Sequence, residues 1–88
     1  MINEAPVKWT IIGAPPGHQA LPQKGRLYEV NHSRKGTFKM RVLGVTREWV
    51  TGVIVEGRAQ AFLDYNVKEE GEEVTVRDSL CSLTWIEE

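Results

Sequence analysis

The sequence predicts a small, all-β protein, and two stretches carry most of that prediction. Residues 36–57, GTFKMRVLGVTREWVTGVIVEG, contain two strand-like runs joined by a short polar turn. In the first run Phe38, Met40 and Val42 alternate with charged residues, which gives a strand one apolar and one basic face. A second alternating stretch, rich in Val, Thr and Leu, closes the chain between residues 74 and 86. Both stretches have the period of two that is typical of a sheet.

Length and composition limit the protein to one simple domain. The chain has 88 residues, of which 41% are hydrophobic and 26% charged, as in an ordinary globular protein with one modest core. No apolar run approaches the roughly 20 residues of a membrane span. The N-terminus lacks the pattern of a secretory signal. We therefore expect a soluble, cytoplasmic protein that does not associate with a membrane.

The net charge of −1 conceals an uneven distribution along the chain. Residues 1–48 carry eight Lys or Arg against three acids, a net charge of +5. Residues 49–88 carry three basic residues against nine acids, a net charge of −6. In a folded sheet these charges either pair across strands or survive as one basic and one acidic patch.

Residues 1–24 are predicted to form an N-terminal arm or strand followed by a loop. The segment 7–12 is apolar enough for a short strand, whereas the Gly- and Pro-rich residues 13–22 exclude regular structure. We expect three residues of the arm to pack on the sheet or on another copy of the chain, because they are too apolar for a free tail. They are Trp9, Ile11 and Ile12.

Residues 25–88 are predicted to form the sheet domain. Its first strand places Tyr28, Val30 and His32 on one face, and residues 33–36 turn the chain into the next strand. Leu43-Gly44 interrupts the alternation, as a β-bulge would.

The run from Trp49 to Val55 is apolar at odd and even positions alike, so we expect a central strand that is covered on both faces. A short fourth strand is predicted at residues 58–63, with a helix as the alternative. The predicted core consists of ten residues: Val30, Phe38, Met40, Val42, Val53, Val55, Val74, Val76, Leu83 and Trp85.

An interruption is predicted at Asp78-Ser79. Apolar residues fall at even positions before it and at odd positions after it, and a shift of one residue turns every later side chain to the other face. We expect about one extra residue or a single helical turn there, which keeps both runs inward. Cys81 is then a small core residue, and as the single cysteine of the chain it has no internal disulfide partner.

A three-strand meander followed by a strand, a one-turn break and a closing strand is how SH3-like small barrels are built, and residues 25–86 resemble that architecture. The resemblance implies a barrel of five or six mostly antiparallel strands. The alternative is a five-stranded OB-like barrel, which would contain a helix, and residues 58–66 are the candidate for it.

The whole chain also resembles small uncharacterised proteins that are encoded by phages and other bacterial mobile elements. The stretches LYEVNHSRKGTF (27–38) and EEGEEVTVRDSLCSLTW (69–85) carry this resemblance. It implies an accessory protein of a bacterial cytoplasm and indicates no mechanism.

The chain offers few candidates for catalysis or metal binding. His18, His32 and Cys81 lack the paired spacing of metal ligands. Ser33 adjoins His32, but neighbouring strand side chains point to opposite faces. The acids of residues 69–73 fit a solvated loop and lack the spacing of a calcium site. We predict a protein with no metal, no cofactor and no enzymatic activity.

The basic segment around the turn at 33–36 is the best candidate for a binding site. Four basic residues occur between positions 34 and 41 with no acid among them. Such a turn can offer backbone amides and cationic groups to phosphates, beside an aromatic ring on which a base stacks. Tyr28 or Trp49 would supply that ring if it faces outward. The predicted nucleic-acid-binding residues are Arg34, Lys35, Lys39, Arg41, Tyr28 and His32.

Two other interpretations stay open. In the first, the turn is simply solvated, Tyr28 and Trp49 belong to the core, and the charges protect a sheet edge from aggregation. In the second, the protein is an adaptor or inhibitor that engages a host or phage protein through its loops and the acidic segment 68–73.

Overall fold

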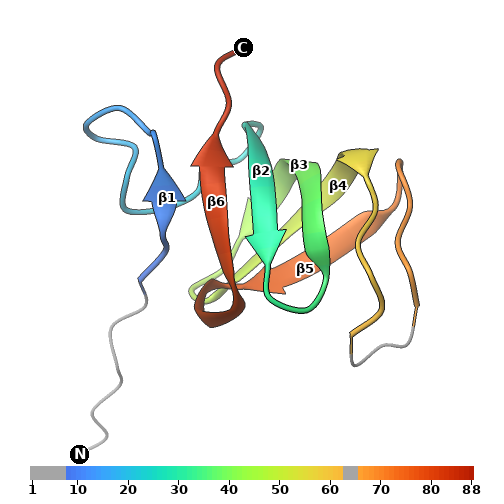
Figure 1. The fold of residues 1–88 in the computed structure, drawn as a ribbon. Helices are drawn as coiled ribbons and strands as arrows, with labels where there is room; N and C mark the ends of the chain where they lie inside the picture. The colour runs from blue at the N-terminus through green and yellow to red at the C-terminus, as the bar shows by residue number, and fades with distance from the viewer. Residues whose placement is uncertain (1–7, 63–65) are drawn as a thin grey trace, which may run out of the picture.

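The computed structural model is a single six-stranded sheet that wraps around one core (Figure 1). It describes residues 8–62 and 66–88. The strands are β1 (Ile11–Ile12), β2 (Leu27–His32), β3 (Gly36–Val45), β4 (Trp49–Gly57), β5 (Glu73–Arg77) and β6 (Cys81–Trp85). Their order in the sheet is β1-β6-β2-β3-β4-β5. The all-β prediction is confirmed, and the sheet is not closed into a barrel, since β1 and β5 end the order unpaired with each other.

The connections form a meander that returns to its first strand. β2 to β5 pair antiparallel in succession, and β6 then pairs antiparallel with the free side of β2. β1 runs parallel to β6 and covers its outer edge, which makes the sheet mixed. Figure 1 shows β5 crossing at a steep angle to β2 and β6, so the sheet is strongly curved around the core. Among the described residues there is no helix that could span a bilayer.

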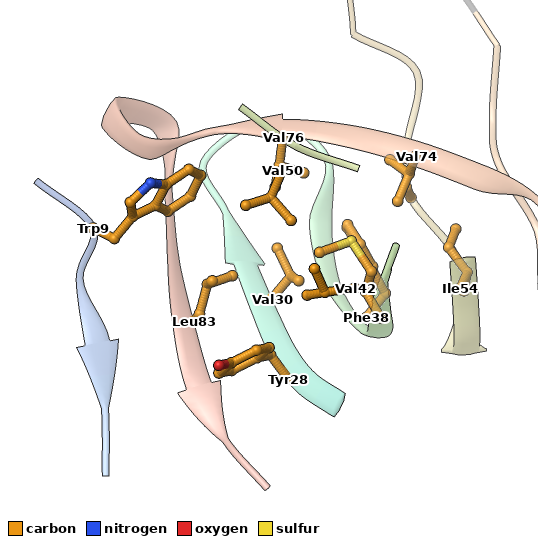
Figure 2. Packing of buried hydrophobic residues seen from close by; sticks show 12 residues of the cluster. Trp9, Tyr28, Val30, Phe38, Val42, Val50, Ile54, Val74, Val76 and Leu83 are labelled. Carbon is orange, nitrogen blue, oxygen red and sulfur yellow. The ribbon is translucent and has the colours of Figure 1, made fainter. Parts of the chain in front are cut away.

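The core lies on the concave side of this sheet (Figure 2). Alternation along β2 and β3 places Val30, Phe38, Met40 and Val42 inward, as predicted. Tyr28, which was predicted as a binding residue, is fully buried beside them. Val74, Val76 and Leu83 also point inward as predicted, while Cys81 and Trp85 are half-buried against the cluster. The sequence pattern therefore predicted most of the core correctly.

The exception is β4, where the prediction of two covered faces is wrong. Val50 and Ile54 point into the core, whereas Val53 is half-buried and Val55 is 44% exposed. The register pairs Lys39 with Glu56 but Met40 with Ile54, so Val55 is the extra residue of a bulge. β4 has an apolar outer face that the core does not use, which the sequence pattern alone could not distinguish from a second buried face.

Two predicted irregularities are confirmed. The β3–β4 register shifts between Val42 and Gly44, where the alternation breaks. After β5, a one-turn 3-10 helix, η1 (Asp78–Leu80), separates the inward residues at even positions from those at odd positions. The turn lets β6 present Leu83 to the same core as β5.

The predicted fourth strand at 58–63 is wrong for the residues that the structure describes, and residue 63 lies outside them. Residues 58–62 form neither a strand nor the alternative helix. Ala59 makes an isolated bridge to Lys68, with hydrogen bonds of 2.9 Å in both directions, and is fully buried. The small side chain of Ala59 thus allows two loop segments, and not two strands, to approach each other closely.

The N-terminal arm packs on its own sheet. Trp9 is 3% exposed and joins the core (Figure 2), Ile11 packs against the core, and Ile12 is 51% exposed. The loop that follows is held over the end of the sheet, where the backbone N–H of Gln23 donates to the Tyr28 hydroxyl at 3.0 Å.

Candidate functional site

Lys39 and Arg41, the two basic residues that the sequence places on β3, are both engaged with acids. Lys39 Nζ lies 3.3 Å from Glu56 Oε2 of β4, and Arg41 Nη2 lies 2.8 Å from Glu88 Oε1. The hydrogen bond from Arg41 holds the pKa of Glu88 below its usual value. Glu29 of β2 is also the cross-strand neighbour of Lys39. The outer face of β3 therefore carries paired charges, and its net positive charge is small.

The basic turn between β2 and β3 is built around His32. Its Nδ1 accepts hydrogen bonds from the backbone N–H groups of Arg34 and Lys35, both at 3.0 Å. This geometry assigns the ring proton to Nε2. Burial, together with the charge of Lys35, lowers the pKa of His32, so the ring is neutral at pH 7. His32 thus shapes the turn through its acceptor nitrogen.

The turn residues differ in exposure. Arg34 is exposed, with its guanidinium carbon 6.0 Å from the centre of the Phe62 ring. Lys35 is only 5% exposed. The four basic residues from 34 to 41 therefore do not form one continuous surface: one is open at the turn, one is buried there, and two are in ion pairs on β3.

The two aromatic candidates are separated clearly by the structure. Tyr28 is fully buried, so its ring presents no face to a base. Trp49, at the start of β4, is 42% exposed, and the guanidinium carbon of Arg77 lies 5.5 Å from its ring centre. Trp49 is thus the candidate for stacking that meets the condition of facing outward.

Trp49 lines a pocket at the end of the sheet where β4 begins and β5 ends. Its volume is about 150 Å³. A cavity of about this volume holds one benzene-sized ring. The walls combine aromatic, cationic and apolar side chains from five separate segments: His32, Lys35, Trp49, Phe62, Thr75, Arg77 and Leu80.

Four of the pocket residues were not predicted from the sequence: Phe62, Thr75, Arg77 and Leu80. They lie far from the basic turn in the chain. Thr75, Arg77 and Leu80 reach the pocket on β5 and η1, and Phe62 reaches it on the segment that follows β4. The sequence held one signal, because Trp49 begins one strand-like run and Arg77 ends another. The structure makes these two residues cross-strand partners.

The remaining reactive groups among the described residues do not form a metal or thiolate site. In residues 8–62 and 66–88 no three His, Cys, Asp or Glu side chains are placed to hold a metal ion. Burial, with a smaller effect from Asp78, raises the pKa of Cys81 to about 12. Its Sγ donates to the Arg77 carbonyl at 3.2 Å. The thiol is therefore protonated at neutral pH.

Comparison of the chain with protein-family models, curated proteins and solved structures found no match. The resemblances to SH3-like barrels and to phage proteins gain no support from these comparisons and stay predictions.

Proposed function

We propose that this protein is a non-enzymatic binding module that takes one base of single-stranded nucleic acid into the pocket beside Trp49. The observation that carries the proposal is a partly exposed indole at the wall of a ring-sized pocket, with an arginine beside it. Base stacking on such aromatic rings is the usual way in which small β domains bind single strands without sequence preference.

The charges around the pocket support a strand that passes over it. Arg34 and Arg77 stand on two sides, next to Phe62 and Trp49 respectively. Arg77 Nη2 bonds to Glu48 Oε2 at 3.1 Å, and both side chains are more than 40% exposed. An ion pair this exposed contributes little, so Arg77 can exchange Glu48 for a phosphate at small cost.

We also propose that the fold is SH3-like. The β2–β5 meander, the 3-10 turn η1 and the return of β6 to β2 support it. The parallel β1 is an addition to that pattern. The OB-like alternative has less support, since the described residues contain no α-helix.

Fluorescence anisotropy with a labelled single-stranded oligothymidine and a matched duplex tests the function. We expect the single strand to bind more tightly, with a log–log salt slope of about −1.4 for two phosphate contacts. Trp49→Ala should weaken binding roughly 5- to 150-fold, the range for losing one base–aromatic stack. Circular dichroism of each variant serves as the control for correct folding.

A pair of double variants separates the pocket from the basic strand. Arg34→Glu/Arg77→Glu should abolish binding, whereas Lys39→Glu/Arg41→Glu, with the same change in net charge, should reduce it less because those side chains are already paired with acids. If the second variant has the larger effect, β3 is the binding surface. If no oligonucleotide binds at about 100 μM protein, the nucleic-acid proposal is wrong.

A protein-binding adaptor or inhibitor is the second candidate, and the paired charges on β3 favour it. In the acidic segment Glu69 pairs with Arg58 at 3.1 Å, whereas Glu70, Glu72 and Glu73 are exposed acids without an ion pair to any described residue. A basic host or phage protein would complement this acidic surface. A pull-down from a bacterial lysate tests this candidate. The control is a variant with Gln at positions 69, 70, 72 and 73, and a partner that also binds the control would show that the acidic surface is not the binding site.

A further inference from the structure

β5 is an edge strand whose outward backbone groups can be identified. The bonds from Ile54 N–H to the Glu72 carbonyl (3.0 Å) and from Asp78 N–H to the Glu48 carbonyl (3.1 Å) flank the β4–β5 ladder. Both use even-numbered residues, and bonded pairs alternate along an antiparallel ladder. Val74 and Val76 therefore bond to β4. The N–H and C=O groups of the odd-numbered residues 73, 75 and 77 point to the free edge.

The sequence of β5 is complementary to itself in charge. It reads Glu73-Val74-Thr75-Val76-Arg77, with opposite charges at equal distances from Thr75. All three odd-numbered residues are exposed. In an antiparallel pair centred on Thr75, Glu73 of each copy lies opposite Arg77 of the other.

We propose that β5 binds β5 of a second copy of this chain, antiparallel and centred on Thr75, so that two sheets join into one. The register makes the outward backbone groups of Thr75 a hydrogen-bonded pair and aligns two Glu–Arg pairs on one face. Opposite charges across strands stabilise a sheet, and like charges destabilise it.

Charge selects this arrangement over the others that an exposed edge allows. An in-register parallel pair would place Glu73 on Glu73 and Arg77 on Arg77. Charged edge residues ordinarily prevent association, and the antiparallel pair centred on Thr75 is the arrangement that places both charges of each copy opposite a charge of the other sign. The contact has two-fold symmetry and uses the same strand of both copies, so it closes at a dimer.

The existing contacts of β5 are compatible with the pair. Glu73 forms no ion pair with any residue that the structure describes. Arg77 would exchange or share its exposed bond to Glu48. The Arg77 carbonyl accepts from Cys81 Sγ and has a second lone pair for the partner strand. At the opposite end of the sheet, β6 is covered by β1 and does not compete.

Sedimentation velocity between about 20 μM and 1 mM protein tests the dimer, since a contact of five residues per copy is small and needs concentrated protein. We expect the weight-average mass to rise with concentration. Glu73→Arg and Arg77→Glu each turn two attractive contacts into repulsive ones, so each should raise the dissociation constant about ten-fold or more. The double variant Glu73→Arg/Arg77→Glu restores both pairs and should restore the dimer.

Glu87→Arg is the matched control, because it makes the same charge change at an exposed position outside β5. It should associate like the unmodified chain. A monomer throughout the concentration range overturns the proposal, and so does a double variant that associates no better than the single ones. The inference is separable from the nucleic-acid proposal, because Glu73 is not a pocket residue and Glu73→Arg leaves the pocket intact.

Discussion

Gly52→Ala tests the packing between β3 and β4 at its tightest point. Gly52 lies on the inward face of β4, opposite Val42 of β3 and Val74 of β5. A Cβ atom there would lie 2.3 Å from Met40 Cγ, 2.6 Å from the Arg41 carbonyl oxygen and 2.8 Å from Met40 Sδ. Ordinary contacts of a Cβ atom are 3.4–4 Å. The added methyl group therefore overlaps both a side chain and a backbone atom.

Neither neighbour can move away easily. Met40 is fully buried, so its side chain can shift only by displacing other core atoms. The Arg41 carbonyl belongs to the backbone of β3, which is fixed by pairing on both sides. Overpacking of this kind costs about 1–3 kcal/mol, partly offset by about 0.5–1 kcal/mol from the lower flexibility of Ala in the unfolded chain. We expect a net loss of about 1 kcal/mol in the free energy of unfolding, equivalent to a fall of about 4–8 °C in Tm for a domain of this size.

Urea unfolding followed by circular dichroism measures this loss. Gly44→Ala is the matched control, since Gly44 is also a strand glycine, but a Cβ atom added to it would meet no neighbouring atom within 4 Å. It should raise the free energy of unfolding by about 0.5–1 kcal/mol, because it gains the lower flexibility of Ala in the unfolded chain and meets no atom in the folded one. Equal, small effects of the two substitutions would show that the β3–β4 contact is looser than these distances require.

Three further predictions concern the core, the thiol and the turn. Ile54→Ala should lower the free energy of unfolding by about 3 kcal/mol, because Ile54 is 1% exposed. Val53→Ala, on the outer face, should lower it by less than about 1 kcal/mol. The reverse order in urea unfolding would contradict the assigned faces of β4. Cys81, with its pKa raised to about 12 by burial, should resist thiol-specific labelling at pH 8 until urea unfolds the protein, and rapid labelling of the native state would show it exposed. The lowered pKa of His32 means that the unfolded chain binds the proton more readily than the folded protein does. The contribution of the neutral ring to stability should therefore be complete above about pH 6.5 and be lost as the pH falls through the pKa of the folded state. His32→Asn, whose Oδ1 can accept the same two N–H bonds, should flatten that dependence in unfolding curves between pH 5 and 8, and an unchanged slope would show that another group titrates.

The alternation of residues was sufficient to predict β2, β3, β5 and β6 and the faces they bury. Phe38, Met40 and Val42 are buried as predicted, because a strand with one polar and one apolar face can bury its apolar residues in only one orientation. The same logic predicted the turn at η1, where the change of parity between Val76 and Leu83 needs an insertion. This reasoning failed for β4, because a strand that is apolar on both faces carries no local signal of which face points into the core.

The candidate site depended on contacts between segments that are distant in the chain. Composition indicated a basic turn with a nearby aromatic ring, but the burial of Tyr28, the exposure of Trp49 and the ion pairs of Lys39 and Arg41 followed from the pairing of whole strands. Local sequence sets the period and the charge of each strand. Which charges meet an acid, and which side chains converge on one pocket, are decided by register and by the path of the chain around the core, and neither is encoded within any single segment.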